Sequence, residues 1–213
     1  MHQSEGYIKF SLELHDAAPP SEAGIASMNQ VRTRLWRIGL IGSYPDGIGF
    51  GNVSVRAPSS ALVSLTATGP SCFYISGTQT GASEVLSPGD YSFVYSYDRE
   101  NNFLQCSGRV RASSESLSHG ACYEANPEIQ GVIHVHSRRL FDYLATQKFP
   151  STSMKAANGT PEIAEDINAL VLKIGEPAGI FYMGGHDEGV IAYGPTVELA
   201  ETVLLELYRM SDR

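Results

Sequence analysis

Apolar residues recur along the chain at two spacings, and each spacing predicts one kind of element. Spacings of three or four residues predict helices that bury one face, as Met28, Val31 and Leu35 do after Ser21, the expected helix cap. Alternation of apolar and polar residues, or a short β-branched run, predicts strands. The predicted helices begin at Ser21, Ser114, Ser137 and Thr160, and a closing helix carries Val197, Ala200, Leu204 and Leu207. The predicted strands span residues 50–56, 61–65, 72–75, 91–97, 103–110, 131–136, 180–183 and 190–193.

The order of these elements predicts an α/β fold. Strands outnumber what a strict alternation of strand and helix would need, so we expect a central, mostly antiparallel sheet with helices on its faces. Residues 1–20 end in Pro19-Pro20 and predict an irregular N-terminal arm, followed by a single domain over residues 21–213. The glycine motifs GxGxxG and GxxxxGK(S/T) are absent from any strand-to-helix turn, which argues against a nucleotide-binding fold.

The composition narrows the classes of partner. The 213 residues carry a formal net charge of −8 at pH 7, so a nucleic acid would be repelled, whereas a small anion could still bind at a local site. No run of the sequence reaches the roughly 20 apolar residues that span a bilayer, so no membrane partner is expected. Three cysteines without a CxxC pair, and an N-terminus without the regions of a signal peptide, predict a cytoplasmic protein.

Histidines supply the first candidate chemistry. His134 and His136 stand two residues apart in a predicted strand, so their side chains share one face. Two imidazoles on one face of an apolar strand suit a divalent metal such as zinc, although hydrogen-bonded histidines would give the same pattern. His186 lies in a glycine-flanked turn between two later strands and could complete a set of three, or it could be a solvated loop residue.

The segment Ser113-Ser114-Glu115 opens a predicted helix and allows two interpretations. A serine cap with a glutamate in the first turn stabilises a helix without any function. The same hydroxyls and free N–H groups also make a site for a small anion, with a carboxylate beside it. His119 lies one turn further along the same helix face and could lean on this site or pair with Glu115.

Four motifs, in order, resemble the class II aldolase/adducin family. They are Gly51-Asn52-Val53-Ser54-Val55-Arg56, Tyr74-Ile75-Ser76-Gly77-Thr78, Ser113-Ser114-Glu115 followed by His134-Val135-His136, and Gly185-His186 followed by Val190-Ile191-Ala192-Tyr193-Gly194. Each motif alone is weak, but the ordered set is specific and spans roughly residues 21–210.

The resemblance implies a ligand set and a substrate. His134, His136 and His186 would bind one divalent ion per subunit, with Zn²⁺ expected, and Glu115 would be the acid/base carboxylate, able to ligate the metal when substrate is absent. The substrate would be a sugar phosphate, and the subunits would form a homotetramer with sites at the interfaces. The residues implied to hold the substrate phosphate are Gly51, Asn52, Ser76, Gly77, Ser113 and Ser114.

The implied activity is a metal-dependent aldolase, a lyase that cleaves a ketose phosphate through a metal-stabilised enediolate. A pentulose-phosphate 4-epimerase or a dehydratase of the same family is the alternative, and a non-enzymatic adducin-like interaction module is a third. One departure bears on this choice: the family's tyrosine proton donor has no counterpart in residues 149–156, where Lys155 sits near the expected place. The proton donor is therefore not predicted.

Overall fold

The computed structural model describes residues 8–58 and 71–212, and it contains an eight-stranded sheet. The strands follow the order β1-β7-β6-β5-β4-β8-β10-β9 across the sheet. Of these neighbouring pairs, β1 and β7 are parallel and the others are antiparallel. The strands are β1 (Ser11–Asp16), β4 (Asn52–Arg56), β5 (Phe73–Ser76), β6 (Tyr91–Asp98), β7 (Phe103–Gly108), β8 (Gly131–His136), β9 (Gly179–Tyr182) and β10 (Gly189–Gly194), with a separate hairpin of β2 (Gly42–Ser43) and β3 (Gly49–Phe50).

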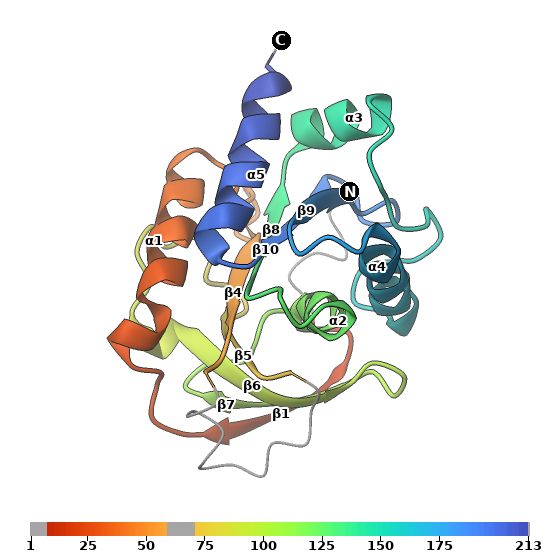
Figure 1. The fold of residues 1–213 in the computed structure, drawn as a ribbon. Coiled ribbons are helices and arrows are strands. Elements are labelled where there is room, and N and C mark those ends of the chain that lie inside the picture. The colour runs from red at the N-terminus through yellow and green to blue at the C-terminus, as the bar shows by residue number, and fades with distance from the viewer. Residues whose placement is uncertain (1–7, 59–70, 213) are drawn as a thin grey trace.

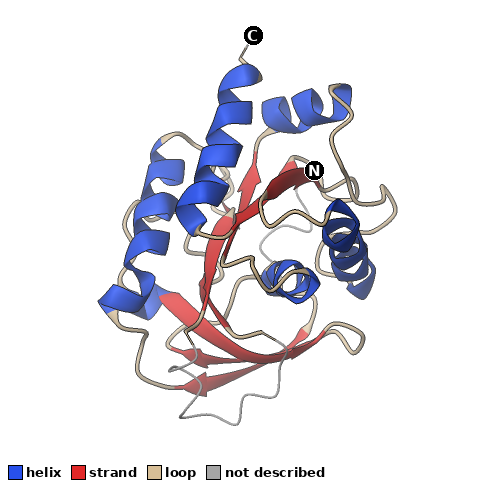
Figure 2. Cartoon of the chain, viewed as in Figure 1, coloured by secondary structure: helices blue, strands red, loops and turns tan. Residues whose placement is uncertain are grey.

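Helices cover both faces of this sheet (Figures 1 and 2). One face carries α1 and α5 side by side, and the other carries α2 and α4 (Figure 1). A shorter helix, α3, packs against β9 and β10. The helices are α1 (Glu22–Arg37), α2 (Ser116–Ala125), α3 (Arg138–Thr146), α4 (Pro161–Ile174) and α5 (Val197–Met210). The predicted fold class, a mostly antiparallel sheet with helices on its faces, is confirmed.

The central strand β8 explains how a histidine pair comes to lie in the interior. Every residue of β8 is buried, because helices cover the strand on both faces. Ile133 and Val135 pack in the core under α1 and α5, whereas Val132 packs in the core under α2 and α4. Since side chains alternate along a strand, His134 and His136 share the face of Val132. The two histidines therefore point to the side on which α2 lies.

Helix starts follow the sequence signals in part. Ser21 caps α1 by accepting from the N–H of Gly24 at 3.1 Å, and Ser137 caps α3 by accepting from the N–H of Leu140 at 3.2 Å. The serine cap expected for the helix after Ser114 is wrong, because α2 begins at Ser116 and Glu115 stands at its N-cap without a side-chain capping bond. Ser113 and Ser114 are thus left in the turn that leads into α2.

The N-terminal arm is more regular than expected. Ser11–Asp16 form β1, a parallel edge strand on β7, so the prediction of an irregular arm is wrong for these residues. The partner strand β7 supplies hydrogen bonds that a short isolated segment lacks. The local sequence of the arm does not reveal this pairing. The strand predicted over residues 61–65 lies outside the described residues. Within residues 8–58 and 71–212, no helix is long and apolar enough to cross a membrane.

Candidate metal centre and anion pocket

Three histidine side chains converge at the end of β8. His134 and His136 come from β8, and His186 lies in the turn that joins β9 to β10. The antiparallel register sets His134 opposite Ile191 and His136 opposite Gly189 of β10, which brings this turn against the histidine pair. The Nε2 atoms lie 3.0 Å apart for His134 and His136, 3.1 Å for His136 and His186, and 3.2 Å for His186 and His134. We call these residues the histidine trio.

The Nδ1 atoms of His134 and His136 each have a hydrogen-bond partner outside the trio. His134 Nδ1 lies 3.3 Å from the carbonyl oxygen of Val190 and can only donate to it, so its Nε2 presents a lone pair to the trio. His136 Nδ1 bonds the Tyr44 hydroxyl at 2.7 Å, and the Phe50 ring stacks on His136. Such partners behind a histidine ring are typical of metal-binding histidines.

Burial keeps His134 and His186 in the neutral form that binds metals. Desolvation lowers the pKa of His134 to about 4, and burial likewise holds the pKa of His186 well below its ordinary value. His134 already uses its one N–H on the Val190 carbonyl, so its Nε2 can only accept a hydrogen bond or bind a cation. Tetrahedral zinc with bonds of roughly 2.0–2.1 Å separates its nitrogen ligands by about 3.3 Å, close to the spacing of the trio. The donor set fits a divalent ion.

A buried carboxyl lies at the start of α2. Glu115 is 1% exposed, its Oε2 accepts from the Ser118 hydroxyl at 2.8 Å, and its Oε1 has no hydrogen-bond partner among the described residues. Desolvation raises the pKa of Glu115 to about 7, although Ser118, Lys9 and Asn158 each oppose this rise. The carboxyl is not among the ligand atoms that lie within 4.8 Å of one another in the trio. A carboxyl that titrates near neutral pH is suited to proton transfer.

A small pocket lies next to the trio and collects most of the residues implied for phosphate binding. Gly51, Asn52, Gly77, Ser113 and Ser114 line it together. In the register of β4 and β8, Asn52 stands directly opposite His134, so the pocket and the trio are neighbours. The Asn52 side-chain oxygen is buried and without a hydrogen-bond partner in the described part of the chain. The pocket offers hydroxyls, an amide and backbone N–H groups, the donors that an anion needs.

Ser76 does not line this pocket. Its hydroxyl accepts from the backbone N–H of Val53 at 3.3 Å, and the side chain is 1% exposed. Thr78 and Thr80, from the loop after β5, line the pocket in its place. The sequence motif identified the right loop, but the threonines that line the pocket stand two and four residues after Ser76.

Helix α1 holds that loop in place through two side chains that sequence analysis missed. The buried Arg32 guanidinium donates to the carbonyl oxygens of Thr80 at 2.9 Å and Glu84 at 2.6 Å, and also to that of Ser83. The Trp36 indole N–H donates to the carbonyl of Gly81 at 2.9 Å. On the opposite wall, Gly51 adopts a φ of +75°, and a Cβ there would meet Ile41 at 2.8 Å, so only glycine fits.

His119 belongs to a polar network beside the site rather than to an ion pair with Glu115. Its Nδ1 bonds the Ser54 hydroxyl at 2.6 Å, and Ser54 also bonds the Tyr123 hydroxyl at 2.8 Å. Burial lowers the pKa of His119 well below its ordinary value, so the ring is neutral. His119 therefore packs under the site and carries no charge toward Glu115.

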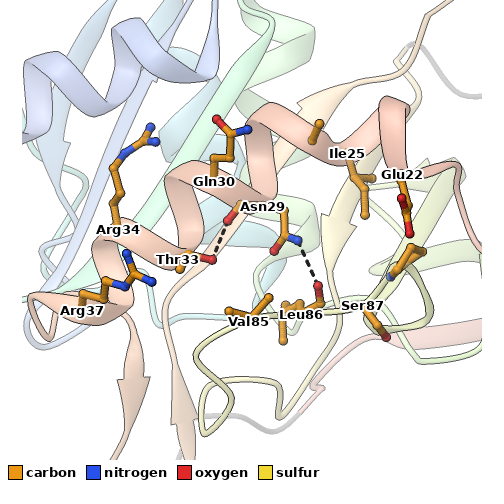
Figure 3. Close-up of a pocket in the computed structure, with 12 residues that line it drawn as sticks. Glu22, Ile25, Asn29, Gln30, Thr33, Arg34, Arg37, Val85, Leu86 and Ser87 are labelled. Atoms are coloured by element: carbon orange, nitrogen blue, oxygen red, sulfur yellow. Dashed lines mark hydrogen bonds between the residues drawn. The ribbon is translucent and has the colours of Figure 1, made fainter.

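A wider groove of about 890 Å³ lies elsewhere, between α1 and the segment before β6 (Figure 3). Asn29 donates across it to the carbonyl oxygen of Leu86 at 2.9 Å. The groove contains no member of the trio and lacks Glu115, and its lining mixes apolar residues with Arg34 and Arg37. Its size alone does not make it the functional site.

Comparison with known proteins assigns the chain to a family. The sequence model for the Class II Aldolase and Adducin N-terminal domain matches residues 46–211, which is 166 of the 213 residues. The chain belongs to this family. No curated protein matches it in sequence.

Solved structures of family members share the fold. A sugar-phosphate aldolase from Thermotoga maritima superposes with a TM-score of 0.65 at 17% identity, covering 90% of this chain and 93% of that chain. L-fuculose-1-phosphate aldolase from Thermus thermophilus gives a TM-score of 0.60 at 19% identity, with 90% and 92% covered. YgbL from Klebsiella pneumoniae, for which an aldolase, epimerase or decarboxylase activity is suggested, gives 0.64 at 16% identity, with 90% and 87% covered. These likenesses show the fold of the class II aldolases and adducins.

Proposed function

We propose that this family member is a metal-dependent carbon–carbon lyase that cleaves a ketose phosphate. The observation that carries the proposal is the histidine trio, a buried set of three imidazoles whose Nε2 atoms lie 3.0–3.2 Å apart. We infer that the trio holds one divalent ion per chain, with zinc the ion expected for imidazole ligands. When bound, such an ion would act as a Lewis acid on the substrate carbonyl.

Glu115 is the residue that we assign to proton transfer. Its pKa of about 7 means that both the acid and the carboxylate are populated at neutral pH. A group with this property can accept a proton from substrate and return it in a later step. The free Oε1 is the atom available for that exchange, because Oε2 already bonds Ser118.

The pocket lined by Asn52, Ser113 and Ser114 is where we expect the substrate phosphate. Because Asn52 pairs with His134 across adjacent strands, a phosphate in the pocket would lie beside the trio. A substrate whose phosphate and carbonyl are a few bonds apart could then reach both regions at once. Holding the phosphate would orient the reacting carbons before any bond breaks.

A second candidate is a 4-epimerase or a dehydratase that uses the same trio. The observation that favours it is the lack of a tyrosine in residues 149–156, together with an exposed Lys155 at the expected place. A non-enzymatic interaction module would have no need for three converging buried histidines. Cytoplasmic location and assembly into a homotetramer stay predictions.

Metal content and product analysis together test the proposal. Untagged protein should contain about one zinc or related ion per chain, and His134→Ala should lose it while keeping the fold. Incubation with a panel of ketose 1-phosphates should release dihydroxyacetone phosphate. Interconversion of pentulose phosphates without cleavage would favour the epimerase, and protein that neither contains nor takes up zinc would contradict the metal site.

A further inference from the structure

Phe50, the last residue of β3, belongs to both parts of the site. It lines the anion pocket together with its neighbours Gly49, Gly51 and Asn52. Its ring also stacks on the ring of His136, with 5.5 Å between the ring centroids and 29° between the ring planes. One residue therefore contacts the anion pocket and a member of the histidine trio.

The hairpin of β2 and β3 holds His136 through a second side chain as well. Tyr44, in the turn of this hairpin, packs its ring against Phe50 with 4.6 Å between the centroids, and its hydroxyl bonds His136 Nδ1 at 2.7 Å. His134 is held differently, because its Nδ1 donates to the carbonyl oxygen of Val190 in β10. The orientation of the His136 ring thus depends on the hairpin, whereas that of His134 depends on the sheet.

The hairpin is also packed directly against the loop after β5. A Cβ on Gly81 would overlap the carbonyl oxygen of Gly42 and lie 2.9 Å from the Cα of Gly49, so the two backbones touch. The Gln79 side-chain oxygen accepts from the N–H of Gly49 at 3.3 Å. The Phe50 ring lies over Gly42, where a Cβ would meet its Cζ at 3.1 Å. With these contacts in place, a shift of the loop is passed on to the hairpin and its aromatic rings.

The loop after β5 supplies Thr78 and Thr80 to the pocket, so an anion bound there contacts the wall that packs on the hairpin. An anion that fixes this wall also fixes Phe50, and the orientation of the His136 ring that a metal needs is then already in place. We propose that Phe50 couples the anion pocket to the histidine trio, so that a phosphate group and a divalent cation bind cooperatively. This inference rests on the proposed metal and phosphate sites and adds a linkage between them.

Zinc affinity measured with and without phosphate tests the coupling. Free zinc is buffered with a chelator, inorganic phosphate is added to saturation, and sodium chloride matches the ionic strength of the phosphate-free sample. We expect zinc to bind roughly fivefold to tenfold more tightly with phosphate, at the low end of the coupling found between linked sites. Zinc should tighten phosphate binding by the same factor, because coupling between two binding sites is reciprocal. Equal zinc affinity in the two samples would overturn the proposal.

Phe50→Leu separates a link through the ring from direct attraction between the two ions. Leucine keeps an apolar side chain but removes the flat ring that stacks on His136, so the ratio of the two zinc affinities should fall to less than half its original value. Direct attraction between cation and anion would survive the substitution, so a smaller fall would overturn the role of Phe50. The matched control is Phe103→Leu, a half-buried phenylalanine on β7 three strands away from β4, which should leave the ratio unchanged.

The substitution should leave the fold intact. Phe50 is half-buried and lies outside the core clusters on the two faces of the sheet, so the melting temperature should stay close to that of the unchanged protein. If leucine lowers it, Phe50→Met, which keeps more of the ring's volume, takes its place in the same measurement.

Because neither binding measurement uses a substrate, the outcomes separate this inference from the proposed reaction. Cooperative binding of zinc and phosphate by a protein that cleaves no ketose phosphate would support the coupling and contradict the reaction alone. Cleavage by a protein whose zinc and phosphate bind independently would overturn the coupling alone. Unchanged protein that takes up no zinc would overturn both.

Discussion

The histidine trio and the anion pocket are neighbours, yet they are built in different ways. The trio stands on two paired strands and their connecting turn, and its members are 0–5% exposed. The pocket is assembled from loops that meet at Asn52, and its shape depends on contacts such as Arg32 with the loop after β5. Strand register fixes side chains through many backbone hydrogen bonds, whereas a loop is fixed by a few long contacts. We therefore expect the trio to keep its geometry without ligand and the pocket to adapt to its anion.

Glu115 directly follows the pocket serines in sequence and stands at the N-cap of α2. The largest expected effect is that of Glu115→Gln, which should lower turnover by roughly 10²–10⁴-fold, as loss of a positioned acid–base group does. The zinc content should stay near that of the unchanged protein, because the trio is intact. Turnover and elemental analysis of the same preparation measure both. Near-normal turnover with metal retained would remove Glu115 from the chemistry.

The same substitution should change how stability depends on pH. Burial raises the pKa of Glu115 from 4.5 to about 7, so between these values the folded protein binds its proton more tightly than the unfolded chain does. The contribution of Glu115 to the free energy of unfolding is therefore fully present below about pH 4.5. It is lost as the pH rises through about 7, and the total loss is roughly 3 kcal/mol. Metal-free Glu115→Gln should match the unchanged protein at pH 4.5 and be more stable at pH 8. Urea titrations at the two pH values measure the difference, and equal stability at pH 8 would show that the charge is not buried.

Tyr44→Phe should weaken the trio without removing a ligand. The hydroxyl at 2.7 Å from His136 Nδ1 holds the ring from behind, and partners of this kind change metal affinity by roughly 10–100-fold. Competition with a zinc chelator gives the affinity directly. Tyr143→Phe, on α3, is the control. An unchanged zinc affinity would mean that the β8 register alone orients His136.

The sequence predicts the strand-borne part of the site better than the part that depends on long-range contacts. The spacing of His134 and His136 places them on one face of a strand by local geometry, and their convergence with His186 follows from a hairpin that the turn residues predict. The hydrogen bond between Tyr44 and His136 joins residues 92 positions apart, and that between Lys9 and Asn158 joins residues 149 positions apart. No local sequence pattern encodes contacts over such separations. The motif assigns Ser76 to the pocket, yet at the end of β5 its hydroxyl turns to Val53, since a strand sends successive side chains to opposite faces.

The smallest effect should come from substitution of the pocket serines, Ser113 and Ser114. It tests whether their hydroxyls bind an anion or only support the start of α2. Ser113 accepts from the N–H of Glu115 at 3.3 Å, so its hydroxyl already has a structural partner, whereas the half-buried Ser114 lines the pocket. Inorganic phosphate should inhibit turnover, and its inhibition constant should rise about fivefold to tenfold in Ser114→Ala, the loss of one hydrogen bond to an anion.

The melting temperature separates the two serines. Ser114→Ala should melt like the unchanged protein, Ser113→Ala should melt lower because it frees the Glu115 N–H, and the double variant should show both effects. Phosphate inhibition that stays the same in the double variant would mean that these hydroxyls serve the helix alone. The phosphate of the substrate would then have to be held by Asn52 and the threonines of the loop after β5, which would make the adaptable wall of the pocket, rather than the start of α2, the part that selects the substrate.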